Sequence, residues 1–154
     1  MKFFINLIRL TSIFFFLSLF LNAQQKEKKI IKILQAGSSS QNELKFPGAN
    51  VLSKMGNIRV HLFHEGALVK SDVSYFYPKK NFFTAKGNIV FTQGDSLKMK
   101  CDYIEYDGEK KIAFASGNVF LERPDMTLNT DSLKLDRMKS KAYYETGGII
   151  RDEE

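Results

Sequence analysis

Apolar and polar residues alternate in short runs along the chain from Val51 onward, with turn-forming residues between the runs. In one run Leu97, Met99 and Cys101 fall on one side of an extended chain, and the lysines between them fall on the other. Such alternation predicts half-buried β-strands. The β-branched and aromatic content also favours strands, and no helical pattern is found after residue 23.

The side on which the apolar residues lie changes within these runs. After Cys101 the apolar positions become even-numbered, so the parity changes at Asp102-Tyr103, and in a later run it changes at Asp131-Ser132. A change of parity inside a strand indicates a bulge or a corner. Because strands that pass from one sheet to a facing sheet need corners, we expect bent strands shared by two layers.

The pattern also repeats about every 30 residues. Gly-Asn pairs begin at Gly56, Gly87 and Gly117, a Gly-Gly pair begins at Gly147, and the intervals are 31, 30 and 30 residues. We interpret each pair as a turn, because Gly and Asn tolerate a positive φ. The polar segment from Gln35 to Asn50 is expected to be a loop.

These features predict an all-β fold of two facing, bent antiparallel sheets. Tight turns favour antiparallel neighbours, and one repeat can bury its apolar side only by stacking on the next. The residues expected to face the interior are Ile58, Val60, Ile89, Phe91, Leu97, Met99, Ile104, Tyr106, Phe114, Val119, Leu121, Met126, Leu128, Leu133 and Leu135.

The first 23 residues read as a signal peptide. Lys2 and Arg9 precede an apolar run from Ile13 to Leu21, and cleavage is expected after Ala23. The alternative is an uncleaved membrane anchor, but the run is only about half as long as a bilayer span of roughly 20 residues. The mature domain is therefore expected to cover residues 24–154, with no cysteine at its start for a lipid anchor.

The net charge of the chain is +6 and it is spread along the sequence. Nucleic-acid-binding proteins concentrate positive charge on one segment or face, so no nucleic-acid partner is expected. Cys101 is the only cysteine, which excludes an internal disulfide, and we expect it to be buried.

Candidate chemistry is sparse. His61 and His64 point to opposite faces of a strand, so we interpret them as surface or loop histidines and not as metal ligands. Asp72, Asp102 and Asp131 recur once per repeat; stacked acids could bind calcium or act on glycosides, but Asp also suits a corner. No catalytic residue, metal site or cofactor is predicted, and an enzyme is not expected.

Aromatic residues are dense between Tyr75 and Phe83 and recur at Tyr143-Tyr144. They either pack within the sheet or form the rim of a lipid groove, where amphipathic rings lie between apolar and wet surroundings. Lys98 and Lys100 lie opposite the apolar side and are expected to be solvated, while lysines near a groove mouth could meet phosphates of an anionic lipid.

Several blocks together resemble the OstA/LptA-like family, and most of all the OstA-like proteins of the Bacteroidota type. They are "AKGNIVFTQGDSL", "CDYIEYDG", "ASGNV", "MTLNTDSLKLDR" and "YYETGG", and the resemblance covers Ile30 to Asp152. It implies a periplasmic protein of lipopolysaccharide transport with a β-jellyroll fold and no catalytic residues. It also implies that the inward-facing residues contact the acyl chains of lipid A.

The resemblance further implies partners. Domains of this family stack edge to edge with other β-jellyroll transport proteins and lead to an outer-membrane translocon. The chain stops at "GGIIRDEE", where a fourth repeat begins, so a truncated or short variant is expected.

Two other functions remain open from the sequence. One is a structural stacking or scaffold module of the cell envelope without lipid cargo. The other is a carbohydrate-active β-solenoid with one Asp per turn, which requires parallel coils.

Overall fold

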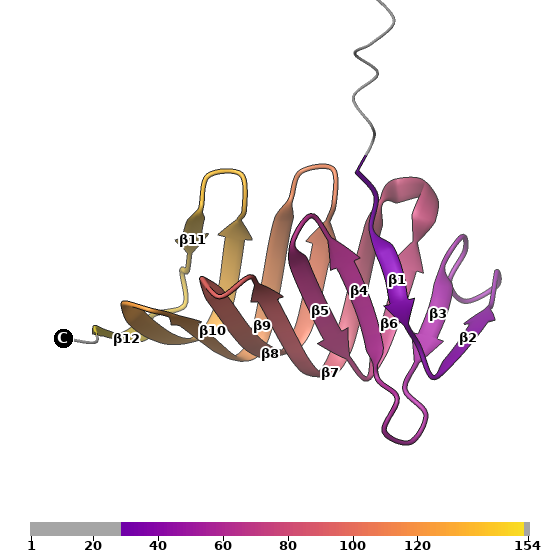
Figure 1. Ribbon diagram of the computed structural model, residues 1–154, viewed down its shortest axis with the longest axis horizontal. Helices are drawn as coiled ribbons and strands as arrows, with labels where there is room; N and C mark the ends of the chain where they lie inside the picture. Colours follow the sequence, from indigo (N-terminus) through magenta and orange to yellow (C-terminus); the bar gives the residue numbers. More distant parts are fainter. Residues whose placement is uncertain (1–28, 153–154) are drawn as a thin grey trace, which may run out of the picture.

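A computed structural model describes residues 29–152, and these form a 12-stranded antiparallel sheet (Figure 1). The predicted leader, residues 1–23, lies outside the described residues. The strands are β1 (Lys32–Gln35), β2 (Ser38–Gln41), β3 (Asn50–Ser53), β4 (Val60–His64), β5 (Ala67–Ser71), β6 (Val73–Tyr77), β7 (Phe82–Gln93), β8 (Leu97–Asp107), β9 (Ile112–Arg123), β10 (Met126–Asp136), β11 (Lys141–Tyr143) and β12 (Gly148–Asp152). One short 3₁₀ turn, η1 (Pro78–Lys80), precedes β7.

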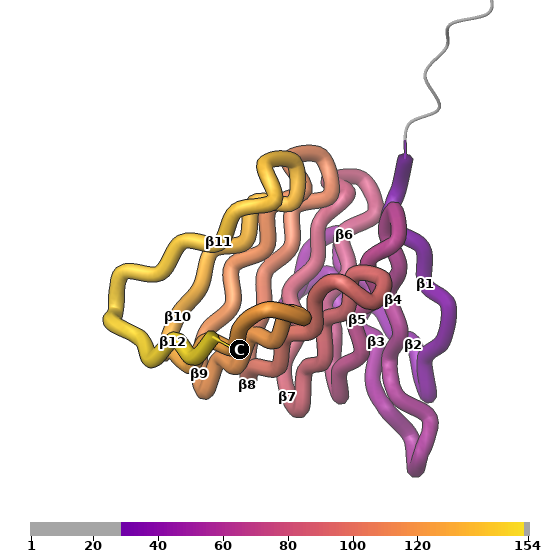
Figure 2. The backbone as a smooth tube through the Cα atoms, turned by 60° about the vertical axis from the view of Figure 1, so that its left-hand side comes forward, coloured from indigo at the N-terminus to yellow at the C-terminus, as the bar shows by residue number. Residues whose placement is uncertain are grey.

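The sheet is folded into two layers that share the long strands β7 to β10. The second half of β7 pairs with β5, whereas its first half pairs with β6. At the other end, the first half of β10 pairs with β12 and its second half with β11. One layer therefore contains β1, β4, β5 and β12, and the other contains β2, β3, β6 and β11. Figure 2 shows the long strands bending between the layers.

The predicted all-β, antiparallel fold is confirmed, and the two facing sheets are two layers of one continuous sheet. The pairs between named strands of the described residues are antiparallel, which argues against a parallel β-solenoid. The predicted loop between Gln35 and Asn50 contains β2, whose polar sequence gave no alternating signal. Among the described residues, no helix has the length and apolar character to span a membrane.

The bend occurs where the parity changes. In β8 the buried positions are odd-numbered up to Cys101 and even-numbered from Ile104, and the register with β9 shifts between Lys100 and Tyr103. In β10 the register with β9 shifts between Thr130 and Ser132. The corners predicted at Asp102-Tyr103 and Asp131-Ser132 are therefore confirmed.

Two of the three Gly-Asn pairs are not turns between strands. Gly56-Asn57 turns a short hairpin, but Gly87-Asn88 lies within β7 and Gly117-Asn118 lies within β9. Both pairs have positive φ, as predicted: 78° and 48° in β7, and 74° and 48° in β9. The strand bulges and bends there instead of reversing, because the same conformation that makes a tight turn also makes a bulge.

The interior between the layers is lined by apolar side chains from both. Twelve of the residues predicted to face inward are buried: Val60, Ile89, Phe91, Leu97, Met99, Ile104, Tyr106, Val119, Leu121, Leu128, Leu133 and Leu135. Met126 is partly buried and packs against this core. Their inward orientation is thus confirmed by burial.

The predicted inward orientation of Ile58 and Phe114 was wrong. Ile58 is 46% exposed, because it lies in the hairpin closed by the Met55–Ile58 bridge beyond the corner. Phe114 is 45% exposed, because Ala113 and Ala115 take the inward positions of β9. Tyr106 and Leu135 pair with Ala113 on either side, so a small residue leaves space for larger neighbours.

Cys101 is buried, as predicted, and its thiol should be unreactive in the folded protein. Burial, reinforced by the charge of Asp102, raises the pKa of Cys101 from 9.0 to about 12. The thiolate fraction at neutral pH then falls about a thousandfold, and the thiolate is the reactive species. We expect a disulfide reagent such as Ellman's reagent to modify Cys101 slowly in buffer and rapidly in denaturant. Equal rates in the two conditions would contradict this burial.

Candidate functional site

The apolar interior and the side of the fold opposite the corner form the candidate site. The two layers are joined by the backbone at the corner, and on the opposite side two rows of strand ends face each other. We call this side the mouth. One row consists of the turns after β4, β7 and β9, and the other of the turns after β6, β8 and β10.

Aromatic side chains extend from the apolar interior to the mouth. The ring of Phe83 packs on that of Tyr106, with centroids 5.4 Å apart, and both side chains are almost completely buried. The hydroxyl of Tyr106 forms a 2.8 Å hydrogen bond with Nδ1 of His64, which comes from the opposite layer. Burial raises the pKa of Tyr106, so this hydroxyl keeps its proton. Tyr106 therefore has its ring in the apolar interior and its polar end at the mouth.

Arg137 crosses the mouth from the turn after β10. Its guanidinium donates to the Tyr106 hydroxyl at 2.5 Å, to the Glu65 carbonyl at 2.8 Å and to Oε1 of Gln93 at 2.9 Å. Since the Tyr106 hydroxyl accepts from Arg137, it can donate to Nδ1 of His64. The Nε2–H of His64 then donates to the Lys29 carbonyl at 3.1 Å.

Glu65 is the carboxylate of this network. Its side chain is 14% exposed and forms ion pairs with Lys111 at 2.5 Å and with Lys29 at 2.8 Å. Hydrogen bonds from Lys111 and Lys29 lower the pKa of Glu65 to about 2, although its burial acts in the opposite direction. Glu65 and Lys111 come from turns of opposite layers, so their pair connects the two sides of the mouth.

The segment before β1 also reaches across the mouth. Ile31 is buried, and its backbone N–H donates to Oδ1 of Asn81 at 2.8 Å, although β1 pairs with β4 in the other layer. Asn81 also donates to the Lys29 carbonyl at 3.3 Å. Residues 29–31 therefore cover one end of the mouth.

The repeated Asp residues lie at the corner, away from the mouth. Asp72 accepts a 2.7 Å hydrogen bond from the side-chain amide of Asn88, and Asp102 accepts one of the same length from Asn118. Asp72 also pairs with Lys54 at 3.0 Å and Arg59 at 3.2 Å. The described residues contain no group of three or more His, Cys, Asp or Glu side chains able to hold a metal ion. These contacts support a structural role for the corner acids.

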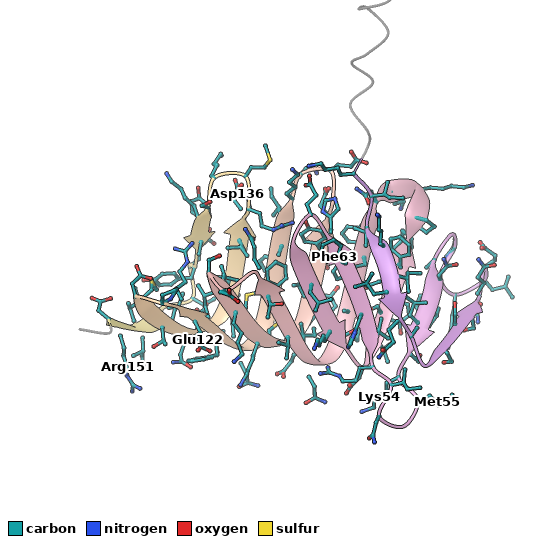
Figure 3. The ribbon with its side chains drawn as sticks, in the orientation of Figure 1. Lys54, Met55, Phe63, Glu122, Asp136 and Arg151 are labelled. Atoms are coloured by element: carbon teal, nitrogen blue, oxygen red, sulfur yellow. The ribbon has the colours of Figure 1, made fainter. Side chains whose placement is uncertain are left out.

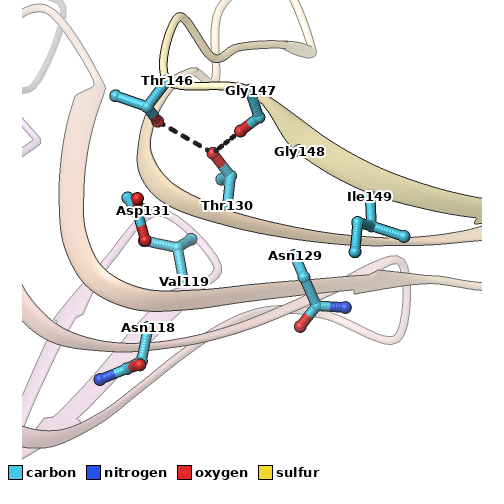
Figure 4. Close-up of a pocket in the computed structure, with 9 residues that line it drawn as sticks. All are labelled: Asn118, Val119, Asn129, Thr130, Asp131, Thr146, Gly147, Gly148 and Ile149. Carbon is cyan, nitrogen blue, oxygen red and sulfur yellow. Dashed lines mark hydrogen bonds between the residues drawn. The ribbon is translucent and has the colours of Figure 1, made fainter.

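The third corner differs from the first two. Gly147 and Gly148 stand where the earlier repeats have Gly-Asn, so Asp131 has no equivalent asparagine, and a pocket of about 490 Å³ opens beside it (Figure 4). Thr130 bonds there to the Gly147 carbonyl at 2.7 Å and to Thr146 at 3.2 Å. Most of the lining is polar, so this pocket is separate in character from the apolar interior.

The prediction that Lys98 and Lys100 are solvated on the outer face is confirmed. Lys98 and Lys100 are exposed, and Lys98 pairs at 3.5 Å with Glu122, one of the outer residues labelled in Figure 3. Among the aromatic residues from Tyr75 to Phe83, Phe76 and Phe83 are buried in the core, while the others are half-buried on the opposite face.

The prediction that both histidines lie on the surface was wrong for His64, which is 3% exposed. Glu65, Lys111 and Arg137 were not predicted at all. Each lies at the end of a strand where a charged residue is ordinary, so its sequence context carries no signal. The available hint was that every second turn of an antiparallel sheet lies at the same edge. When the sheet bends into two layers, its two edges, and the turns on them, face each other.

Comparisons with known proteins agree with this fold. A family model described as OstA-like protein matches residues 28–154. A similar solved structure is that of LptH from Pseudomonas aeruginosa, described as the LptA-homologous periplasmic component of the conserved lipopolysaccharide transport device. The two structures superpose with a TM-score of 0.68 at 12% identity, over 82% of this chain and 97% of that chain. No curated protein matches the sequence significantly.

Proposed function

The chain belongs to the family of OstA-like proteins, and from this premise we propose that it binds the acyl chains of lipopolysaccharide between its two layers. It helps to carry the lipid across the periplasm toward the outer membrane. A signal peptide cleaved after Ala23 delivers it to that compartment. The single observation that carries the proposal is the continuous apolar interior between two layers that meet at the mouth through side-chain contacts.

An interior of this kind suits acyl chains because it needs no specific chemical group. Each methylene removed from water contributes roughly 0.8 kcal/mol, so a chain can be held by apolar contact alone and can slide along the stack. The inward-facing residues, such as Phe91, Met99 and Leu128, are the proposed contacts. The interior is filled by these side chains, so an acyl chain enters as the two layers part at the mouth.

The sheet edges are the proposed contacts with protein partners. The described sheet has β1 and β2 at one end and β11 and β12 at the other, and β12 is exposed throughout. An unpaired strand edge offers backbone donors and acceptors to another strand. We propose that other β-jellyroll transport proteins stack there and link the chain to an outer-membrane translocon.

Site-specific photo-crosslinking tests the lipid contact. A photoreactive amino acid at Phe91, Met99 or Leu128 should capture lipopolysaccharide in cells. The same amino acid at Lys98 or Lys100, on the outer face of β8 on either side of Met99, is the matched control and should not. Capture at both sets, or at neither, would contradict the proposal.

A scaffold module without lipid cargo is the second candidate. The observation in its favour is that the interior side chains, from Val60 to Leu135, are closely packed against one another. A scaffold would give no lipid adduct at any of the interior positions and would still assemble through its edges.

A further inference from the structure

Side-chain contacts join the two layers at the mouth, whereas continuous strands join them at the corner. Arg137 joins its own layer to Gln93 and to the Glu65 carbonyl, and the pair of Glu65 with Lys111 forms a second connection. The hydrogen bond between His64 and Tyr106 forms a third, at the boundary of the apolar interior. Five of the residues in these contacts are called the latch below: His64, Glu65, Tyr106, Lys111 and Arg137.

Positive charge gathers around the single carboxylate of the latch. Lys29, Lys111 and Arg137 all bond to Glu65, the first two through its carboxylate and Arg137 through its carbonyl. Other lysines of the same edge have acids within their own turns: Lys110 pairs with Asp107 at 3.1 Å, and Lys139 pairs with Asp136 at 3.6 Å. Lys29 and Lys111 therefore share Glu65 as their carboxylate partner, and their side chains are 68% and 31% exposed to a competing anion.

Resting on the proposed function, we propose that Lys111 and Lys29 form a binding site for a phosphate of the lipid headgroup. In the closed state Glu65 occupies this site. A phosphorylated headgroup displaces the Glu65 carboxylate from the two lysines, which releases one connection across the mouth as the acyl chains enter beneath it.

Three physical features support this exchange. Phosphate oxygens and carboxylate oxygens accept the same charge-assisted hydrogen bonds from lysine, so one can replace the other. Lys29 is 68% exposed, so a headgroup in solution can reach it first. Arg137 bonds to both Glu65 and Tyr106, and Tyr106 packs on Phe83, so a phosphate at Lys111 places the attached acyl chains near the apolar interior.

Protonation is a poor alternative trigger. With the pKa of Glu65 lowered to about 2, the ion pairs are complete above its ordinary value of 4.5 and are lost only as the pH falls toward 2. At neutral pH the latch therefore opens by competition for the cations and not by loss of the Glu65 charge.

The test compares two variants that break the same ion pair. Glu65→Gln removes the competitor and leaves the lysines, whereas Lys111→Met removes a proposed phosphate ligand. Affinity of the mature protein is measured for bisphosphorylated lipid A and for dephosphorylated lipid A with the same acyl chains, and inorganic phosphate is added as a competitor. Lys110→Met is the matched control, because Lys110 is 72% exposed on the same turn and pairs with Asp107.

For bisphosphorylated lipid A, we expect Glu65→Gln to raise the affinity and Lys111→Met to lower it, each by about fivefold, the equivalent of one partly exposed ion pair. For dephosphorylated lipid A, both variants should raise the affinity alike, since both loosen the latch. Lys110→Met should change neither. Inorganic phosphate at equal concentration should not displace the lipid, because it lacks acyl chains.

Changes of the same sign in both variants with bisphosphorylated lipid A would overturn the phosphate site and leave the proposed function standing. Displacement by inorganic phosphate would overturn the assignment to a lipid headgroup. Failure of the unmodified protein to bind either lipid would overturn the proposed function itself. If Lys111→Met does not unfold cooperatively, Lys29→Met gives the same comparison on a more exposed side chain.

Discussion

Replacement of Phe91 by alanine is expected to lower the free energy of unfolding by about 3–5 kcal/mol. Phe91 is fully buried in β7, where it pairs with Val69 of β5 and Met99 of β8. Removing its ring takes away apolar burial and leaves a cavity among side chains from neighbouring strands. Chemical denaturation of the variant and the unmodified protein measures the difference.

Phe114→Ala is the matched control for this variant. The same chemical change on the outer face of β9, where Phe114 is 45% exposed, should lower the free energy of unfolding by about 1 kcal/mol or less. The pair tests the correction of the sequence prediction, in which both phenylalanines faced inward. Equal losses in the two variants would contradict the orientation of β9.

Gly117→Ala is expected to lower the free energy of unfolding by about 2–4 kcal/mol, from backbone strain and a lost corner contact. Gly117 has φ +74°, which an L-residue adopts only at a cost. A β-carbon there would lie 2.8 Å from Oδ2 of Asp102. Asp102 would have to move, and its 2.7 Å hydrogen bond with Asn118 would be lost.

Gly66→Ala separates the two contributions. Gly66 has φ +82°, but a β-carbon there meets nothing within 4 Å. Its replacement should cost only the backbone strain, about 1–2 kcal/mol. Denaturation curves of the two variants give the contribution of the corner contact by difference. A Gly117→Ala variant no less stable than Gly66→Ala would show that the corner tolerates a side chain.

The corner shows which features of the fold can be predicted from residues close together in the sequence and which cannot. The corners at the parity changes and the positive φ of Gly87-Asn88 and Gly117-Asn118 were predicted, because each depends on residues close to one another in the chain. The role of Gly87 and Gly117 as bulges was not predicted. A turn and a bulge share the same local conformation, and only the pairing of the flanking strands distinguishes them.

The sequence by itself determined the all-β class, the bent strands, most of the inward-facing residues and the burial of Cys101. It did so because alternation with a period of two records which side of each strand is buried. It misplaced Phe114, since hydrophobicity alone does not show that Ala113 and Ala115 face the large side chains of neighbouring strands.

Only the tertiary structure decided the mouth and the latch. Arg137 donates to the carbonyl of Glu65, which is 72 residues away in the chain, and Lys111 reaches the same residue from another turn. Neither contact has a local sequence pattern, because each forms only when the layers fold over a shared apolar interior. The alternation of apolar and polar residues specifies which side chains of each strand are buried, whereas the contacts that close the mouth form only when the whole sheet folds.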